Sequence, residues 1–256
     1  MRILLTNDDG YFAPGIRALA KELCKEHEVV LVAPEKEHSG QSHAITIHHS
    51  LVVKKVEIDG LSIDAYSVSG TPADCVRAGI DKIVPWRPDV IFSGCNLGYN
   101  AGMDIIYSGT VSAALEGVLL GIPSVAVSAK WVDGDAEFET AATIACGVFE
   151  KVKDSFLNNP EPTVLNINVP YLSVDEVKGV RVADIGENAY DYYFEEEVDG
   201  ERMLSLKGRS KMEFKEGTDR YFLERGYATL TPVIYGSADP EVMERLTSWL
   251  DDEGAL

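Results

Sequence analysis

Apolar and polar positions along the first two-thirds of the chain follow two alternating patterns. Short and almost entirely apolar runs, such as Ile3–Thr6 and Val29–Ala33, are typical of strands buried on both faces. Between them, Gly15–Lys25 has apolar residues every three or four positions, which predicts an amphipathic helix. Later apolar runs predict strands at Val90–Ser93, Ser124–Ser128 and Thr163–Val169. This alternation predicts an α/β fold, with a mostly parallel sheet covered by helices on both faces.

Helices are expected between the later strands. Thr71 and Pro72 suit the N-cap and the first position of a helix that runs toward Ile83. Two more helices are predicted, from Thr110 to about Leu120 and from about Glu137 to Asn158.

Two segments interrupt this pattern. Ala44–Ser67 alternates apolar and polar residues and predicts antiparallel hairpins. Asn188–Gly226 is rich in Tyr, Phe and acidic residues without a clean period, which favours an extended arm or hairpin. A strand at Tyr227–Pro232 and a helix from about Pro240 to Leu250 complete the chain. We expect one domain, residues 1–256, with a core of about 1–185 and 227–250 and an arm of about 186–226.

Composition places the chain among ordinary globular proteins. It has 256 residues, of which 45% are hydrophobic and 25% charged. No apolar run approaches the roughly 20 residues of a membrane span, and Met1–Asn7 turns polar too early for a secretory signal. We therefore expect a soluble, cytoplasmic protein. The net charge of −19 argues against binding to nucleic-acid duplexes or anionic membranes.

Polar residues follow three of the predicted strands. Asp8 and Asp9 lie in Asn7-Asp8-Asp9-Gly10 after the first strand, Ser39 follows the second, and Asn96 follows Val90–Ser93. Ligands of parallel sheets bind beyond the carboxyl ends of the strands, so these residues should converge. Adjacent carboxylates favour a cation, and this oxygen-rich set suits Mg²⁺ or Mn²⁺ better than Zn²⁺. The alternative is a plain turn in which Asp9 caps the next helix.

A second candidate is the helix start Tyr107-Ser108-Gly109-Thr110-Val111-Ser112. Its free N–H groups, its hydroxyls and the positive end of the helix dipole would suit a phosphate. The alternative is simple capping by Ser108 or Thr110. The chain has no G-x-x-x-x-G-K-[ST] loop, no G-x-S-x-G elbow, and no G-x-G-x-x-G after its first strand. These absences argue against a Walker nucleotide site, an α/β-hydrolase and a Rossmann dinucleotide site.

Two further groups of side chains are candidates for function. His38 and His43 flank Ser39 and could reach the same pocket. The arm carries several aromatic residues, which favour packing on another subunit over holding a cofactor. They are Tyr190, Tyr192, Tyr193 and Phe194.

Six segments that together span nearly the whole chain match the motifs of a known family. They are Thr6-Asn7-Asp8-Asp9-Gly10, His38-Ser39-Gly40, Ser69-Gly70-Thr71-Pro72-Ala73-Asp74-Cys75-Val76, Ser93-Gly94-Cys95-Asn96-Leu97-Gly98-Tyr99-Asn100, Tyr107-Ser108-Gly109-Thr110-Val111-Ser112-Ala113-Ala114 and Asn166-Ile167-Asn168-Val169-Pro170. Because these segments occur in the family's order, the chain closely resembles the SurE (survival protein E) family of 5′/3′-nucleotidases. Cys95 departs from the small or aliphatic residue usual in the family.

The resemblance implies a Rossmann-like three-layer αβα core and a nucleoside monophosphate substrate. It also implies one divalent metal ion per subunit, held by Asp8, Asp9, Ser39 and Asn96. The phosphate would contact Asn96 and the Ser108-Gly109-Thr110 helix start. The family forms dimers or tetramers through swapped C-terminal arms, so a homodimer or homotetramer is expected.

The favoured hypothesis is hydrolysis of nucleoside 5′- or 3′-monophosphates by a metal-activated water. Asp8 and Asp9 would be the catalytic residues, with Asp9 favoured over Asp8 as proton acceptor. One alternative is an aspartyl-phosphate phosphatase, although such enzymes favour D-x-D, which is absent at the first strand. Another is a non-catalytic sensor that binds a nucleotide or a metal ion, and a structural Ca²⁺ site is a third.

Overall fold

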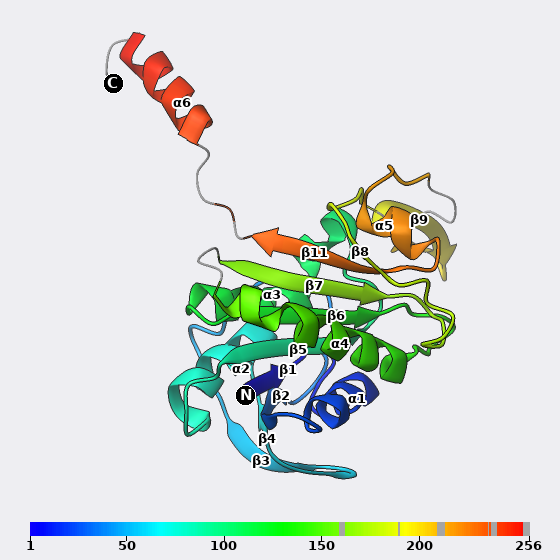
Figure 1. Ribbon diagram of the computed structural model, residues 1–256. Coiled ribbons are helices and arrows are strands. Elements are labelled where there is room, and N and C mark those ends of the chain that lie inside the picture. The colour runs from blue at the N-terminus through cyan, green and yellow to red at the C-terminus, as the bar shows by residue number, and fades with distance from the viewer. Residues whose placement is uncertain (159–161, 189, 209–212, 235, 237–239, 253–256) are drawn as a thin grey trace.

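The computed structural model describes residues 1–256 except 159–161, 189, 209–212, 235, 237–239 and 253–256. A nine-stranded sheet crosses its centre in the order β3-β4-β2-β1-β5-β6-β7-β11-β8 (Figure 1). Every pair from β4 to β7 is parallel, whereas β3 and β11 run antiparallel to β4 and β7. The expected α/β fold with a mostly parallel sheet is confirmed.

The elements have the following bounds. The strands of the large sheet are β1 (Arg2–Thr6), β2 (Glu28–Pro34), β3 (Val53–Ile58), β4 (Leu61–Val68), β5 (Val90–Leu97), β6 (Ser124–Ala129), β7 (Thr163–Val169), β8 (Val180–Val182) and β11 (Ala228–Ile234). The helices are α1 (Pro14–Leu23), α2 (Pro72–Ala78), η1 (Gly79–Ile83), η2 (Gly102–Tyr107), α3 (Gly109–Leu119), α4 (Phe138–Leu157), α5 (Asp219–Leu223) and α6 (Pro240–Asp252).

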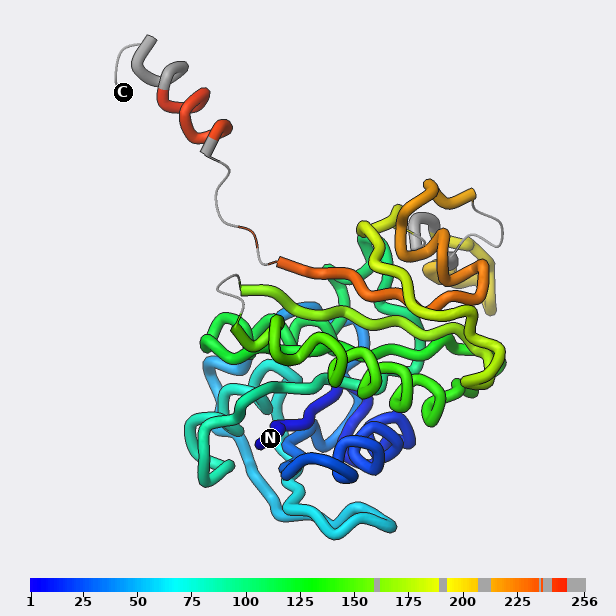
Figure 2. The backbone as a smooth tube through the Cα atoms, viewed as in Figure 1, coloured from blue at the N-terminus to red at the C-terminus, as the bar shows by residue number. Residues whose placement is uncertain are grey.

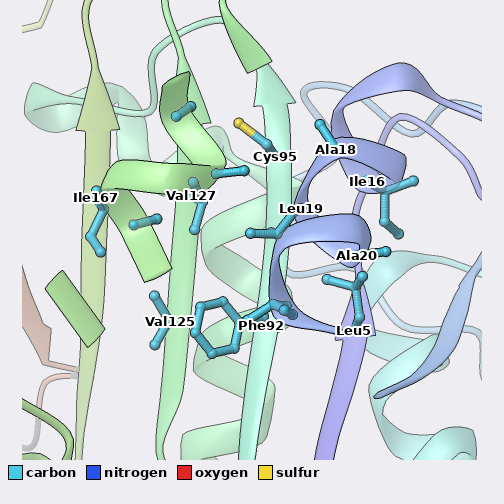
Figure 3. Close-up of a cluster of buried hydrophobic side chains, with 14 of the residues drawn as sticks. Leu5, Ile16, Ala18, Leu19, Ala20, Phe92, Cys95, Val125, Val127 and Ile167 are labelled. Atoms are coloured by element: carbon cyan, nitrogen blue, oxygen red, sulfur yellow. The ribbon is translucent and has the colours of Figure 1, made fainter. Parts of the chain in front are cut away.

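The helices bury their apolar sides against the two faces of the sheet. On one face, α1 and α4 cover a cluster that includes Leu5, Leu19 and Phe92 (Figure 3). Phe92 and Phe149 of α4 meet edge to face, with ring centroids 5.1 Å apart. On the other face, α2 and α3 cover smaller clusters around β1, β2, β5 and β6. Burial on both faces explains why the central strands are almost entirely apolar.

The helix starts agree with the predicted signals. Thr71 caps α2: its hydroxyl accepts from the Asp74 N–H, and the Asp74 carboxylate accepts from the Thr71 N–H. The helix expected to reach Ile83 is α-helical only to Ala78, and a π-helical segment, η1, continues it.

The prediction of hairpins throughout Ala44–Ser67 is wrong for its first part. Only β3 and β4 form a hairpin, and β4 pairs with β2, so the hairpin extends the main sheet. No strand forms at 44–50. There the backbone binds side chains instead: Thr46 N–H donates to the Asp74 carboxylate, and the Ala44 carbonyl accepts from the Thr71 hydroxyl. These side chains replace the ladder that the alternation suggested.

A second correction concerns the expected loop at Gly94–Gly109. Strand β5 continues beyond Ser93 to Leu97, with an irregularity in its pairing to β6 between Ser93 and Asn96. Asn96 is therefore held on a strand opposite Ser128. The rest of the segment contains the short 3₁₀ helix η2.

The last part of the chain leaves the sheet twice. The strands β9 (Tyr190–Val198) and β10 (Glu201–Gly208) form a separate antiparallel hairpin. Helix α6 extends away from the sheet (Figure 2). In the described part of the chain, no helix is both long and apolar enough to span a membrane. The cytoplasmic location stays a prediction.

Candidate functional site

The three predicted loops meet at one edge of the sheet. β1 lies between β2 and β5 and is parallel to both, so the carboxyl ends of the three strands are adjacent. The chain passes from β1 to β2 on one side, whereas β5 lies on the other. This reversal of direction across the sheet is where ligands of doubly wound folds bind.

The turn after β1 is built by its first residue. Asn7 is fully buried; its amide donates to the Gly10 carbonyl, and its Oδ1 accepts from the Gly10 N–H, at 3.0 and 3.2 Å. Gly10 has φ +103°, a conformation that side chains rarely adopt. The His38 N–H donates to the Asp8 carbonyl at 2.8 Å and ties the loop after β2 to this turn. The Asn and Gly of Asn-Asp-Asp-Gly thus shape the turn that presents the two aspartates.

Asp8 is buried against the start of α3. Its Oδ1 accepts a hydrogen bond from the Thr110 hydroxyl. A Cβ on Gly109 would lie 2.8 Å from the Asp8 Cβ, so only glycine fits there without a shift. Burial raises the pKa of Asp8 even though the Thr110 hydrogen bond opposes the shift.

Asp9 lies beside it, and its Oδ2 accepts from the Leu97 N–H at 3.3 Å. Burial, together with the Asp8 charge, raises the pKa of Asp9 to about 7. The N-cap of α1 is Ala13, with no side-chain hydrogen bond, so the alternative that Asp9 caps this helix is wrong. A buried carboxyl beside a partly buried one, both with raised pKa values, is an arrangement that a bound cation would stabilise.

A cleft of about 770 Å³ opens at this edge. Asp8, Ser39, Asn96 and Ser108 all line it. The other lining residues are Gly40, Leu97, Gly98, Tyr99, Asn100, Asp104, Tyr107, Asn188, Tyr193 and Leu206. Four of the seven predicted site residues therefore reach one cavity, while Asp9, Gly109 and Thr110 contact its wall.

The two neutral candidates differ in their contacts. The Asn96 amide donates to the Gly98 carbonyl at 2.9 Å, which leaves its Oδ1 to act as a ligand. The Ser39 hydroxyl is exposed and donates to Glu37 at 2.7 Å. In the described part of the chain, no three His, Cys, Asp or Glu side chains form a metal-binding group. A cation here would therefore need neutral oxygens beside Asp8 and Asp9.

The start of α3 is capped by a side chain, as the capping alternative predicted. Ser108 is the N-cap, and its hydroxyl accepts from the Val111 N–H at 3.1 Å. Thr110 does not cap the helix, because its hydroxyl binds Asp8. The helix dipole and the first N–H groups of this helix point to the same edge as Asp8.

The two histidines are occupied by structural contacts. His43 pairs with Glu116 of α3 at 2.8 Å, and Arg77 binds the other oxygen of Glu116 at 2.5 Å. Both partners lower the pKa of Glu116 against the effect of its burial. His38 is buried and contacts Gln41 at 2.8 Å. Neither histidine lines the cleft.

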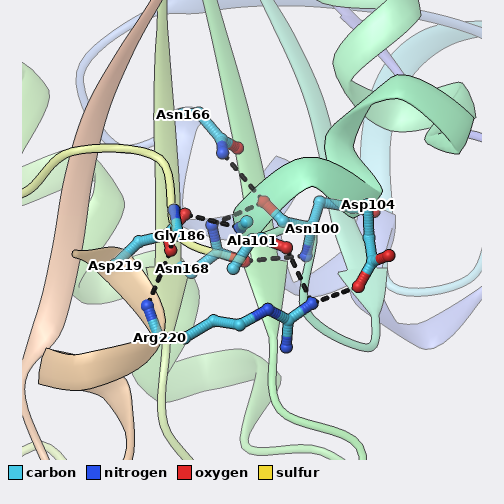
Figure 4. A network of polar contacts seen from close by, with 9 residues as sticks. Asn100, Ala101, Asp104, Asn166, Asn168, Gly186, Asp219 and Arg220 are labelled. Carbon is cyan, nitrogen blue, oxygen red and sulfur yellow. Dashed lines mark hydrogen bonds and ion pairs between the residues drawn. The ribbon is translucent and has the colours of Figure 1, made fainter. Parts of the chain in front are cut away.

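A polar network connects Asn100 and Asp104, which line the cleft, to β7 and α5 (Figure 4). The Asn100 carbonyl accepts from the Asn166 and Asn168 amides at 2.8 and 3.0 Å. Nearby, Arg220 of α5 donates to the Ala101 carbonyl and pairs with Asp104. A second group of contacts centres on Asp219, which accepts from the N–H groups of Gly102 and Gly186. The wall is therefore held by β7 and α5.

Sequence reasoning did not associate the arm with the cleft. Tyr193 and Leu206, from β9 and β10, both line it. The side chains of Tyr190 and Tyr192 lie outside the described residues. That arm aromatics pack on another subunit stays a prediction, but Tyr193 contributes to the cleft of its own chain. No local signal places a hairpin beside a strand end about a hundred residues earlier.

Known proteins share this architecture over nearly the whole chain. A family model described as "Survival protein SurE" matches residues 3–192. The protein named 5′-nucleotidase SurE from Clostridium tetani (strain Massachusetts / E88) is 47% identical over 251 residues, covering 97% of this chain and 100% of the relative. Its namesake in Clostridium botulinum (strain Kyoto / Type A2) is 45% identical over 247 residues, covering 95% and 97%. The crystal structure of the SurE protein from Aquifex aeolicus superposes with a TM-score of 0.84 at 37% identity, covering 97% of this chain and 99% of that one.

Proposed function

The chain belongs to the SurE family, and we propose that it is a metal-dependent nucleotidase that hydrolyses nucleoside 5′- or 3′-monophosphates to nucleoside and phosphate. The observation that carries the proposal is the Asp8–Asp9 pair, in which buried Asp8 binds Thr110 at the start of α3 and lines the cleft. The pair provides negative charge for a cation, and the helix start provides N–H groups for a phosphate.

The residues at this edge fit one Mg²⁺ or Mn²⁺ ion. Asp8 and Asp9 have raised pKa values that a cation would lower, and Ser39 and Asn96 add neutral oxygens. Oxygen-only ligand sets favour these hard cations. When bound, the ion would withdraw charge from the phosphoryl oxygens and make a water molecule more acidic.

The protein's own groups have separate roles in this proposal. The helix start Ser108-Gly109-Thr110 would hold the phosphate through the Gly109 N–H, the Ser108 hydroxyl and the helix dipole, because the Ser108 N–H already donates to the Ile105 carbonyl at 3.2 Å. Asn96 would contact the phosphate from β5. The Thr110 hydroxyl fixes the Asp8 carboxylate, which would bind the metal ion. Asp9 is less buried than Asp8, and the Thr110 hydroxyl binds Asp8 rather than Asp9, so Asp9 is the less constrained of the two carboxylates. We therefore assign the proton-accepting role to Asp9.

We also propose that the chain forms a homodimer or homotetramer. Helix α6 extends from the sheet and exposes Met243 and Leu246, which lie three residues apart on one side of the helix. Such an apolar side is typical of a helix that packs on another chain. Light scattering after size-exclusion chromatography measures the mass, and a monomer at micromolar concentration would contradict this proposal.

Replacement of Asp8 by Asn tests the catalytic proposal. We expect Asp8→Asn to lose most hydrolysis of AMP and of p-nitrophenyl phosphate, because an amide cannot balance the cation's charge. Isothermal titration should show weaker Mn²⁺ binding. Asp175→Asn, at an exposed aspartate, is the matched control and should behave like the unaltered protein.

Three outcomes would refute the proposal. Full turnover by Asp8→Asn in EDTA would exclude a metal role for this residue. A phospho-aspartate trapped after an acid quench would favour direct attack by an aspartate. Tight AMP binding without phosphate release under any metal ion would favour a sensor.

A further inference from the structure

The β9–β10 hairpin closes one side of the cleft with apolar side chains. Tyr193 and Leu206 are direct partners in the antiparallel ladder, so both project from the same face of the hairpin. Both line the cavity that also contains Asp8, Asn96 and Ser108. The hairpin therefore adds an apolar wall to a site whose other residues are mainly polar.

These two side chains are well exposed to solvent. Tyr193 is 64% exposed and Leu206 is 50% exposed. Apolar groups left in water beside a polar site are typical of a surface that a ligand or partner covers. Their position inside the cavity favours a ligand that occupies the same cavity.

The cleft is much larger than a phosphate group requires. At about 770 Å³, it lies within the roughly 300–1,000 Å³ of sites that bury an organic ligand. The ester end of such a ligand would lie beside Asp8, Asn96 and Ser108. Tyr107, from η2, also lines the cleft and is 51% exposed, so a second ring is available beyond the phosphate.

A flat aromatic group bound to the phosphate ester fits this division of the cleft. Base rings stack on tyrosine, and stacking tolerates different bases because every base has a π-face. The structure thus favours a nucleoside over a small aliphatic alcohol as the group carried by the phosphate.

We propose that Tyr193, packed beside Leu206, is a specificity-determining residue that binds the nucleoside part of the substrate. This inference rests on the proposed nucleotidase function and adds a residue from the arm to it. Binding energy from a group remote from the reacting bond raises kcat/KM for substrates that carry that group, and leaves smaller esters unaffected.

The test compares two phosphate monoesters, AMP and glycerol 2-phosphate, which has no ring. For Tyr193→Ala, we expect kcat/KM for AMP to fall roughly 5- to 100-fold, the loss expected for one stacked base. Activity on glycerol 2-phosphate should stay within about twofold, because the phosphate and metal residues are unchanged. Tyr193→Phe keeps the ring and should retain most AMP activity.

Met203→Ala is the matched control. Met203 lies on β10 of the same hairpin and is 47% exposed, but it pairs with Glu196 on the opposite face. Its replacement should leave both substrates unaffected, and a loss of AMP selectivity there would overturn the role of the cleft face.

The results separate this inference from the proposed function. An unaltered protein that hydrolyses neither ester contradicts the nucleotidase proposal itself. If the unaltered protein hydrolyses AMP and Tyr193→Ala matches it, only the assignment of Tyr193 is wrong. Equal losses on both esters would show that Tyr193 supports the site as a whole, and would also overturn its role in specificity.

Discussion

Gly109 offers a sharp test of how closely Asp8 must approach α3. Replacing it with alanine adds a Cβ that would lie 2.8 Å from the Asp8 Cβ and 2.9 Å from its Oδ2. Carbon atoms in contact prefer separations of about 3.5–4.0 Å, so something must move by roughly 0.7–1.2 Å. Asp8 is held through its backbone by His38 and through its side chain by Thr110. The displacement therefore falls on the carboxylate or on the start of the helix.

We expect a large loss of activity and a loss of stability that ranges from none to moderate. Overpacking costs about 1–3 kcal/mol, while removing a glycine from a helix gains up to about 1 kcal/mol. The net change in the free energy of unfolding is thus a loss of about 0–3 kcal/mol. A shift of about 1 Å in a catalytic group can reduce turnover by about 100-fold.

Two measurements check this prediction. Urea unfolding gives the stability, and phosphate release with saturating Mn²⁺ gives the activity. Gly147→Ala is the control: Gly147 lies within α4, where an added Cβ meets nothing within 4 Å. This variant should gain about 0.5–1 kcal/mol and keep full activity. Full activity of Gly109→Ala would refute the claim that Asp8 must approach the helix so closely.

Two other changes have defined outcomes. Arg220→Ala leaves buried Asp104 without its cation, so thermal unfolding should show a loss of about 3–5 kcal/mol, and an unchanged melting temperature would contradict the role of the network. His27 concerns pH: burial lowers its pKa below 6.5, the nearby N-terminus and Lys153 lower it further, and Glu150 opposes them. Since the unfolded chain then binds a proton more readily than the folded one, stability should fall as pH falls through 6.5. His27→Gln should flatten that slope in urea unfolding, and an equal slope would show that other groups cause it.

Local patterns in the sequence were enough where neighbouring residues decide the structure. The strand Thr163–Val169 is predicted with the bounds observed for β7, because a mainly apolar segment of seven residues is too short for a typical helix and favours a strand buried on both faces. Thr71 and Ser108 cap their helices through side chains within three residues. Asp8, Ser39 and Asn96 were brought together by a general property of parallel sheets, which holds whatever the loops contain.

Other features depend on contacts between distant residues. Residues 44–50 alternate like a strand, but Asp74 and Thr71 compete for their backbone groups from almost 30 positions away. The extension of β5 to Leu97 depends on its pairing with β6. The position of Tyr193 in the cleft depends on how the β9–β10 hairpin packs. Secondary-structure propensity and hydrophobic periodicity depend on residues that are close along the chain, so they cannot predict these contacts.

The contacts of α5 also bear on when the site forms during synthesis. Arg220 and Asp219 hold Ala101 and Gly102 across 119 and 117 positions. Ribosomes add about 5–20 residues per second, so a growing chain carries Asp8 and Asn96 for several seconds before α5 exists. During that interval the cleft wall lacks its anchor. The order of the elements along the chain thus delays completion of the site until most of the protein has left the ribosome, and truncation before Asp219 should leave a chain that cannot assemble it.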